Sequence, residues 1–272
     1  MWCLSKALRC VSQLYVLVHA IAPTELQTRN RNFTTPRKEV QRKILCLISQ
    51  MDEDEVVLLG FWTSPYVMRV KIALAEKGVH YYYMEEGNLF KNKSTLLLKM
   101  NPVFKKVPVI IHNDKSICES LIILQYIDDV WNDRAPILSE DPYQRAKARF
   151  WIDFFDKKMA DCGRRMWASK GADQEAAKKE FIESLKLLEG ELGEKPYFEG
   201  DRFGLLDIAL VPFSCRFYTY ETLCNFSVEK ECPKLIEWVK RCSLRESVSK
   251  SLPDQYKVYD FVLEFKKMLG IN

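Results

Sequence analysis

The spacing of apolar and polar residues predicts strands and helices in a mixed order over residues 56–131. A short apolar run at 56–59 predicts a buried strand. Pro65 suits the first turn of a helix, and apolar residues recur at helical spacing from there to Lys77 and Gly78. Further strands are predicted at 80–83, 107–111 and 116–118, and further helices at 95–100 and from Glu119 to about Trp131. The predicted order is strand–helix–strand–helix–strand–strand–helix.

The second half of the chain shows only helical periodicity. A polar stretch with Pro136 separates it from the first half. Apolar residues then recur at helical spacing in three sets, which are Tyr143, Ala146, Phe150 and Phe154; Phe181, Leu185, Leu188 and Leu192; and Leu235, Trp238, Val239 and Cys242. We therefore expect an α/β domain at 53–132, a linker at 133–142 and an all-α domain at 143–272.

Residues 1–52 differ from the rest of the chain. Residues 1–50 hold eight basic and two acidic side chains, and an apolar run at 11–22 follows Lys6 and Arg9. The run is shorter than the ~20 residues that span a bilayer, so no stable membrane insertion is expected. It suits a secretory or organelle signal, although Pro23 fits a cleavage site poorly. The third alternative, which we favour, is a disordered upstream extension that need not belong to the working protein, because Met51 opens a well-formed domain.

Charge and cysteine content exclude several classes of protein. The net charge is +4, but the basic excess lies in the first 50 residues, so no nucleic-acid partner is expected. The nine cysteines are odd in number and include no C-x-x-C pair, and the chain has only three histidines. A metal site is therefore not expected, and the thiols are predicted to be reduced and mostly buried.

Two positions in the first half suit the binding of a small peptide. Pro108 lies inside an apolar run, where it is either an edge-strand proline or a cis-proline next to a peptide ligand, as in thioredoxin-like domains. The order of elements favours the cis-proline. Ser64 begins the first helix, where backbone N–H groups and the helix dipole favour an anion. Its hydroxyl either donates to a bound thiolate or only caps the helix.

Glu119 and Ser120 repeat this arrangement at a later helix. There a ligand carboxylate would meet the hydroxyl and an ammonium group would meet the glutamate, unless both residues simply cap the helix. Lys93, Lys105 and Lys106 lie in predicted loops, where each alone would be an ordinary solvated charge. Taken together, these residues describe a pocket for a zwitterionic peptide with two carboxylates, one ammonium group and one thiol.

Longer stretches of the chain resemble plant-type, tau-class glutathione transferases from about Glu55 to the end. The matching stretches are WTSPYVMRV at 62–70, RVKIALAEKG at 69–78, NPV at 101–103, KKVPV at 105–109, ICESL at 117–121, QYIDDVWND at 125–133, DPYQRAKARFW at 141–151 and DIALVPF at 207–213. The resemblance implies a thioredoxin-like N-terminal domain and an all-α C-terminal bundle. It also implies a cytoplasmic homodimer that serves detoxification and the stress response in a plant.

The resemblance further implies an activity and the residues that perform it. The enzyme would conjugate the glutathione thiolate to small hydrophobic electrophiles, with glutathione peroxidase as a side activity and no cofactor. Ser64 would donate a hydrogen bond to the glutathione sulfur. The other implied glutathione contacts are Lys93 and Lys106 at the glycine end, Val107 before cis-Pro108 at the cysteinyl backbone, and Glu119 with Ser120 at the γ-glutamyl end. The implied electrophile site contains Tyr66, Arg164, Trp167 and Arg216.

The sequence departs from the family pattern in places. Phe104 stands where the family usually has His, Ala160 where it often has Tyr, and Arg216 where it often has Trp, and the stretch at 87–91 is longer. Arg216 would either face the pocket and favour acceptors with a carboxylate or nitro group, or point to solvent. These departures leave open a non-catalytic ligand-binding protein (a ligandin). A thiol-transferase of the same fold would need Cys in place of Ser64.

Overall fold

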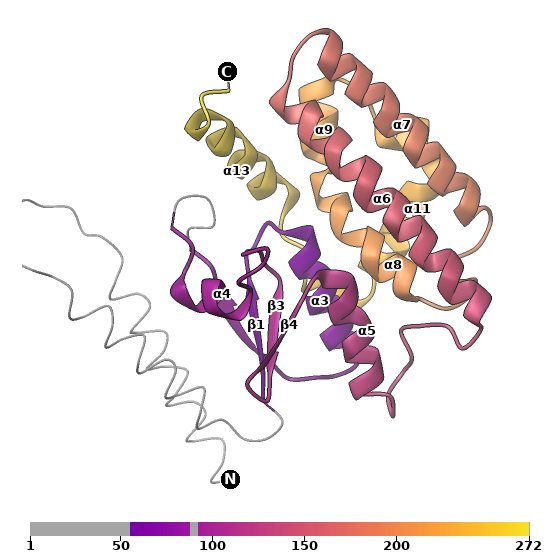
Figure 1. Ribbon diagram of the computed structural model, residues 1–272. Helices are drawn as coiled ribbons and strands as arrows, with labels where there is room; N and C mark the ends of the chain where they lie inside the picture. The colour runs from indigo at the N-terminus through magenta and orange to yellow at the C-terminus, as the bar shows by residue number, and fades with distance from the viewer. Residues whose placement is uncertain (1–54, 88–91, 272) are drawn as a thin grey trace, which may run out of the picture.

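The computed structural model describes residues 55–87 and 92–271, so the expected extension at 1–52 and most of the longer stretch at 87–91 lie outside the described residues. The described chain forms a sheet with flanking helices, followed by a bundle of helices (Figure 1). The sheet has four strands in the order β2-β1-β3-β4. The strands are β1 (Val56–Gly60), β2 (Tyr82–Glu85), β3 (Val109–His112) and β4 (Lys115–Cys118). β1 pairs in parallel with β2 and antiparallel with β3, which pairs antiparallel with β4.

Helices cover both faces of this sheet. α3 (Pro65–Glu76) and α5 (Ser120–Val130) lie on the side of the helical bundle, and α4 (Thr95–Met100) lies on the opposite side (Figure 1). Val56 and Leu58 pack into the large core shared with the bundle. Val57 and Leu59 pack with Leu97 of α4 in a smaller core. Because β1 is covered on both faces, its sequence is continuously apolar instead of alternating.

The strand register gathers four chain segments at one end of the sheet. Leu59 pairs with Val109, and Val109 pairs with Cys118. The end of β1, the start of β3 and the end of β4 therefore form one row. Gly60 pairs with Glu85, so the end of β2 joins the same row. The segments that leave this edge are the loop to α3, the approach to β3, the start of α5 and the loop to α4.

Two strands begin later than the sequence pattern predicts. β2 begins at Tyr82 because the N–H of Val79 turns back to the Leu74 carbonyl at 2.8 Å to close α3. The chain then needs further residues to reach the sheet. β3 begins at Val109 because Pro108 has no N–H to give to the ladder. The hairpin turn predicted between β3 and β4 is present, with positive φ at Asn113 and Asp114.

The second half of the described chain is helical, as predicted. Its elements are α6 (Pro142–Ala168), α7 (Ala172–Leu192), α8 (Leu205–Leu210), the 3₁₀ helix η1 (Val211–Arg216), α9 (Phe217–Cys224), α10 (Val228–Glu231), α11 (Pro233–Ser243), α12 (Glu246–Ser249) and α13 (Gln255–Met268). The long helices α6 and α7 lie side by side, and α13 lies apart from them toward the first domain (Figure 1). No helix in the described ranges has both the length and the apolar character needed to cross a bilayer.

The apolar residues singled out at the start of α6 do not face the core. The helix forms as predicted, but Tyr143 and Phe150 are 69% and 63% exposed. The neighbouring stripe supplies the core instead, with Ala148, Ile152, Phe155 and Met159 all buried. α6 therefore carries apolar residues on an outward face as well as an inward one. The predicted α7 residues, in contrast, are all buried.

A buried carboxylate organises the start of α8. The Asp207 side chain accepts hydrogen bonds from Gly204 N at 3.0 Å, Phe198 N at 3.1 Å and Trp238 Nε1 at 2.7 Å. These bonds join α8 to the preceding loop and to α11. Burial raises the pKa of Asp207 to about 6, although the three donors favour its ionised form.

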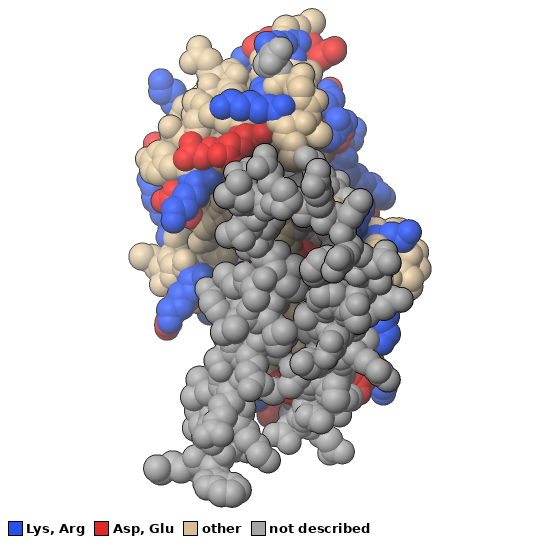
Figure 2. All heavy atoms as spheres, turned by 90° about the vertical axis from the view of Figure 1, so that its left-hand side faces the viewer, with Lys and Arg blue, Asp and Glu red and all other residues tan. Residues whose placement is uncertain are grey.

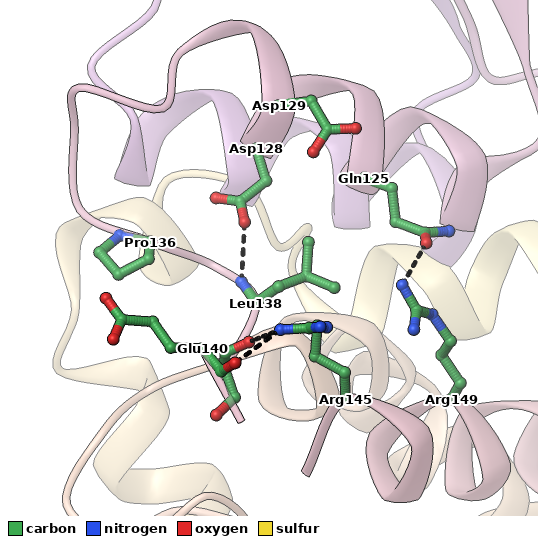
Figure 3. A pocket seen from close by; sticks show the side chains of 9 residues that line it. Gln125, Asp128, Asp129, Pro136, Leu138, Glu140, Arg145 and Arg149 are labelled. Carbon is green, nitrogen blue, oxygen red and sulfur yellow. Dashed lines mark hydrogen bonds between the residues drawn. The ribbon is translucent and has the colours of Figure 1, made fainter. Parts of the chain in front are cut away.

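A pocket of about 440 Å³ lies where α5, the linker and α6 meet (Figure 3). Asp128 accepts from Leu138 N at 3.0 Å and pairs with Lys77 at 2.6 Å, which holds the linker against α3 and α5. Arg149 donates to Gln125 across the pocket at 2.7 Å, and Figure 3 shows the two side chains pointing toward each other. None of the predicted site residues lines this pocket. The hydrogen bonds around it join the linker and α6 to α5.

The distribution of charged side chains and cysteines agrees with what the composition predicted. Basic and acidic side chains are interspersed on the visible part of the face shown in Figure 2. The cysteines that the structure describes are free thiols, and all but Cys118 are buried. Burial raises the pKa of several of these thiols, including that of Cys215 to about 11, so they are unreactive at neutral pH.

Candidate active site

Ser64 lies between β1 and α3, at the end of the sheet where the four segments meet. It is the N-cap residue of α3, and its Oγ accepts from Val67 N at a long 3.4 Å. Pro65 follows at the first helical position, where its missing N–H costs nothing. Within the described residues, the Ser64 hydroxyl proton has no recorded acceptor. Ser64 can therefore cap the helix weakly and still donate to an anion placed at the helix start.

The segment before β3 presents backbone groups at the same end of the sheet. The Val107–Pro108 peptide bond is cis, as expected. Buried Asn101 shapes the preceding loop, because its Nδ2 donates to the Lys106 carbonyl at 2.9 Å and its Oδ1 accepts from Phe104 N at 3.1 Å. These bonds hold the loop in a fixed path beside the start of β3.

Glu119 and Ser120 enter α5 in an unusual conformation. Glu119 has φ 70° and ψ 119°, a region that non-glycine residues rarely adopt. Such strain costs roughly 1–3 kcal/mol and is concentrated at ligand sites. Neither side chain caps α5, which contradicts the ordinary-cap alternative. The Glu119 carboxylate is exposed, whereas Ser120 is buried and its Oγ accepts from Arg69 Nη1 at 3.2 Å.

Arg69 is the central buried residue behind this site, and the sequence analysis did not single it out. Its side chain is fully buried and pairs with Asp156 of α6 through two bonds of 2.9 Å and 2.6 Å. Its Nε donates to the Ala209 carbonyl of α8 at 2.8 Å. A basic residue among the buried apolar positions of α3 was the available signal. Arg69 links the start of α5 to two helices of the bundle.

The two lysines of the predicted site flank the sheet end. Lys93 is half-buried and precedes Ser94, the N-cap of α4, whose Oγ donates to Glu86 at 2.5 Å. Lys106 is exposed beside the cis peptide bond. In the part of the chain that the structure describes, neither lysine forms an ion pair. Both ammonium groups are therefore available to a ligand carboxylate.

Two of the predicted electrophile-site residues meet at the junction of the domains. Tyr66 is half-buried in the first turn of α3, and its ring contacts Phe213 edge-on at 5.5 Å. Burial raises the pKa of Tyr66, so its hydroxyl is protonated at neutral pH. Arg216 is half-buried, and its Nη2 donates to the Thr63 carbonyl at 2.9 Å. The alternative in which Arg216 points to solvent is therefore wrong.

The other two electrophile-site residues lie on α6, near its C-terminal end. Arg164 is exposed and donates to Asp161 at 2.9 Å. The half-buried Trp167 ring lies 5.8 Å from Phe265 of α13. Phe265 stacks on Phe261 at 6.0 Å, which in turn contacts Trp62 at 5.7 Å.

An aromatic row thus connects the Ser64 loop to α6 by way of α13. The sequence analysis did not identify Phe261 and Phe265, which lie on the final helix. Their spacing of one helical turn was the signal. The row gives a flat apolar acceptor a surface on which to pack.

The arrangement suits a peptide thiol that reacts beside an apolar surface. Backbone groups, a hydroxyl, an exposed carboxylate and two ammonium groups surround the sheet end, and aromatic rings lie beside it. No group of three or more His, Cys, Asp or Glu side chains in the described ranges is placed to hold a metal ion.

Comparison with known proteins identifies the family. The model for the glutathione S-transferase N-terminal domain matches residues 54–129, and the model for the C-terminal domain matches residues 145–246. A probable glutathione S-transferase, parA of Nicotiana tabacum, is 60% identical over 221 residues, which are 81% of this chain and 100% of the relative. Glutathione S-transferase U19 of Arabidopsis thaliana is 59% identical over 214 residues, which are 79% of this chain and 97% of the relative.

Solved structures agree with this grouping. A rice glutathione transferase crystallised with glutathione has a TM-score of 0.76 at 47% identity, covering 80% of this chain and 99% of the other. A tau-class enzyme from mango, Mangifera indica, has a TM-score of 0.73 at 41% identity, covering 78% of this chain and 98% of the other. The chain therefore belongs to the glutathione S-transferase family, and its relatives place it in the tau class.

Proposed function

We propose that the protein transfers the thiolate of glutathione to an electrophilic carbon of small hydrophobic acceptors, with reduction of hydroperoxides as a side activity. The observation that carries this proposal is the Ser64 hydroxyl at the start of α3, in one row with cis-Pro108 and the strained Glu119. In this mechanism Ser64 donates a hydrogen bond to the sulfur and is not a nucleophile. Its hydroxyl stabilises the thiolate before attack.

The energetics of this step are sufficient without a metal. A free thiol has a pKa of about 8.5, and lowering it by ~2 units requires about 2.7 kcal/mol of preferential thiolate stabilisation. A hydrogen bond to an anion contributes about 1.5–3 kcal/mol. A helix N-terminus adds roughly 0.3–1 kcal/mol. Ser64 and the start of α3 together reach the required amount.

The remaining glutathione contacts follow from the same end of the sheet. We propose that Lys93 and Lys106 bind the glycine carboxylate, and that the backbone of Val107 pairs with the cysteinyl residue. Glu119 would accept from the γ-glutamyl ammonium, and its exposed carboxylate with no recorded partner among the described residues supports this role. Ser120 would hold the γ-glutamyl carboxylate, and its bond from Arg69 supports this by fixing the hydroxyl.

The acceptor would bind between the Ser64 loop and the helical domain. We propose that Tyr66, Arg164, Trp167 and Arg216 border this site, together with Phe261 and Phe265. The row of ring contacts from Trp62 to Trp167 supports an apolar acceptor. Burial of a flat aromatic acceptor against such rings favours binding by the hydrophobic effect and by edge-on or offset ring contacts.

We also propose a homodimer in which the first domain of one subunit meets the helical domain of the other. Exposed apolar side chains in both domains support this arrangement. Val103 and Phe104 are 76% and 55% exposed near the start of β3, and Tyr143 and Phe150 lie on the outward face of α6. Exposed large apolar side chains of this kind are typical of association sites.

The chain division and the location are proposals as well. We propose an extension at 1–52, a glutathione-binding domain at 53–132, a linker at 133–142 and an acceptor-binding domain at 143–272. The start of the family match at residue 54 supports the first boundary. The free thiols among the described residues support a reducing, cytoplasmic location. Targeting by residues 1–50 to an organelle or the secretory route is the alternative.

Turnover of a chloronitrobenzene with glutathione tests the proposed function. We expect saturable conjugation by the full chain, and reduction of an organic hydroperoxide at a lower rate. A protein that binds glutathione and the aromatic acceptor without turnover would instead be a ligand-binding protein. That result would refute the proposal, and calorimetry with each ligand would separate it from a protein that binds neither.

A further inference from the structure

We propose that Arg216 is a positioning residue that activates glutathione: its guanidinium holds the Thr63–Ser64 peptide group and supplies a positive charge that stabilises the bound thiolate. This inference rests on the proposed function. It assigns Arg216 a role toward the thiol rather than toward the acceptor alone.

The first observation is the hydrogen bond across the domain junction. Arg216 ends η1 in the helical domain, and its Nη2 donates to the Thr63 carbonyl at 2.9 Å, although the residues are 153 positions apart. The Thr63 carbonyl belongs to the same peptide group as Ser64 N. That N–H donates in turn to the Phe61 carbonyl at 2.9 Å. Both polar atoms of the peptide group are therefore held, which orients the Ser64 side chain.

The second observation is the lack of a counter-charge. Among residues 55–87 and 92–271, Arg216 forms no ion pair with a carboxylate. The nearby Arg69, in contrast, is neutralised by Asp156. The Nε atom of Arg216 is buried and has no hydrogen-bond partner. A half-buried guanidinium without a carboxylate partner exerts its electric field in a region where water screens it poorly.

Titratable groups from several elements surround Arg216. The titratable groups around it are Tyr66 and Arg69 of α3, Asp156 of α6, Cys215 of η1 and Tyr220 of α9. α13 adds the apolar Val258, which packs with Cys215.

The charge of Arg216 affects the pKa of two nearby tyrosines, Tyr66 and Tyr220. Burial and Asp156 raise the pKa of Tyr66, and Arg69 and Arg216 oppose that rise. The charge of Arg216 therefore acts on the hydroxyl of Tyr66, a residue in the first turn of α3 and two positions after Ser64. The fully buried Tyr220 is affected in the same direction, because Arg216 opposes the rise in pKa that burial causes.

The pH dependence of kcat/KM tests the proposal in the full-length protein. The assay uses glutathione and two matched chloronitrobenzenes, one with and one without a carboxylate, and compares wild type with Arg216→Met, Arg216→Trp and Arg216→Lys. The two neutral variants should raise the apparent pKa of the bound thiol by about 0.5–1 unit, as followed by kcat/KM and by thiolate absorbance. Below the thiol pKa the rate should fall about three- to tenfold and should recover at higher pH. Arg216→Lys should keep the thiol pKa near that of wild type.

Arg241→Met is the matched control. Arg241 is also half-buried and donates to a backbone carbonyl, that of Pro196 at 2.7 Å, but it lies on α11. The Arg241→Met variant should leave the pH dependence of kcat/KM unchanged. Two neutral replacements of different shape are used so that poor folding of one does not decide the result. Arg216→Trp restores the residue that the family often has at this position.

Three outcomes would overturn the proposal. An equal loss of rate at every pH would give Arg216 only a structural role. An unchanged thiol pKa with a loss confined to carboxylate-bearing acceptors would assign Arg216 to the acceptor. A pKa raised equally by Arg216→Lys would exclude the charge as the cause. If wild type shows no turnover, the proposed function fails, and titration of bound glutathione in wild type and Arg216→Met still decides the inference.

Discussion

Arg69 Nη1 donates to Ser120 Oγ at 3.2 Å, so one buried side chain of α3 holds the hydroxyl that begins α5. α3 and α5 begin at the two places where we expect the sulfur and the γ-glutamyl group of glutathione. The bond fixes the distance between those places. The expected consequences for catalysis and stability can be measured one residue at a time.

Replacement of Ser64 by alanine should slow conjugation. We expect Ser64→Ala to lower kcat about 10- to 100-fold, equivalent to about 1.4–2.7 kcal/mol, because the thiolate loses its hydrogen-bond donor. The pKa of bound glutathione, followed by thiolate absorbance, should rise. Ser227→Ala is the control, since Ser227 also accepts a long 3.4 Å cap bond, from Lys230 N of α10. An unchanged rate and thiol pKa would remove Ser64 from the mechanism.

Neutralising the lysines of the sheet end should weaken glutathione binding. Lys93→Met and Lys106→Met should each raise the KM for glutathione about three- to tenfold with little change in kcat, because a carboxylate loses one cation. The effect should shrink at high ionic strength. Lys115→Met is the control, because Lys115 lies on β4 at the opposite end of the sheet. If all three variants have the same KM for glutathione, Lys93 and Lys106 do not bind the ligand carboxylate.

Asp207 should make stability depend on pH. Its folded-state pKa of about 6 is above the ordinary value of 3.8, so the native state holds the proton more tightly than the unfolded state. The stability from this group is complete below the unfolded pKa and is lost as pH rises through about 6. Chemical denaturation of wild type and Asp207→Asn should therefore give a stability difference that becomes less favourable to wild type between these pH values.

The same substitution should also destabilise the protein at low pH. An asparagine amide would face one of the three N–H donors, at a cost of about 1–3 kcal/mol. Asp201→Asn is the control, because Asp201 is exposed. A pH-independent difference between wild type and Asp207→Asn would show that Asp207 does not titrate in this range.

The outward face of α6 should be part of a subunit interface. Light scattering of the wild type should give twice the chain mass of 31.9 kDa. Phe150→Asp should raise the dimer dissociation constant at least about tenfold, equivalent to ~1.4 kcal/mol, because a charge would be buried against apolar surface. Leu244→Asp is the control at a residue that is 87% exposed elsewhere. A monomeric wild type, or equal behaviour of both variants, would contradict the proposed interface.

Removal of residues 1–50 should leave an active enzyme. The regular apolar pattern begins near Val56, and the family match begins at residue 54. We expect the chain that starts at Met51 to keep its kcat/KM and to lose less than about 2 kcal/mol of stability, which is within the range of one ordinary point mutation. Thermal and urea unfolding of both chains would measure this, and a larger loss would show that the segment stabilises the folded domains.

Local patterns were enough to predict most elements of the first domain. The helix at 95–100 has the predicted limits, and the cis-proline and the hairpin turn are where they were expected. These features depend on neighbouring residues. The start of β2 was misplaced because the N–H of Val79 closes α3 through Leu74, a contact that apolar spacing does not reveal.

Contacts between the domains could not be predicted from local patterns. Lys77 caps the C-terminal end of α3 as predicted, but its buried side chain also pairs with Asp128 of α5, which local spacing does not show. Arg69 and Arg216 find their partners in the other domain, at separations of 87 and 153 residues. Side-chain spacing along one helix cannot show which atoms a docked domain will bring to it. The buried stripe of α6 was missed for a related reason, since two apolar stripes on one helix look alike until the packing partner is known.

The burial of Arg69 also limits how such a protein can be divided or recombined. Two of its partners, Asp156 and Ala209, belong to the helical domain, so docking a helical domain that has no carboxylate at position 156 would leave a buried guanidinium unpaired. An unpaired buried charge costs several kcal/mol. The sheet domain is therefore not a portable module that could be exchanged alone between relatives. A chimera has to keep Arg69, Asp156 and the part of α8 that contains Ala209 together.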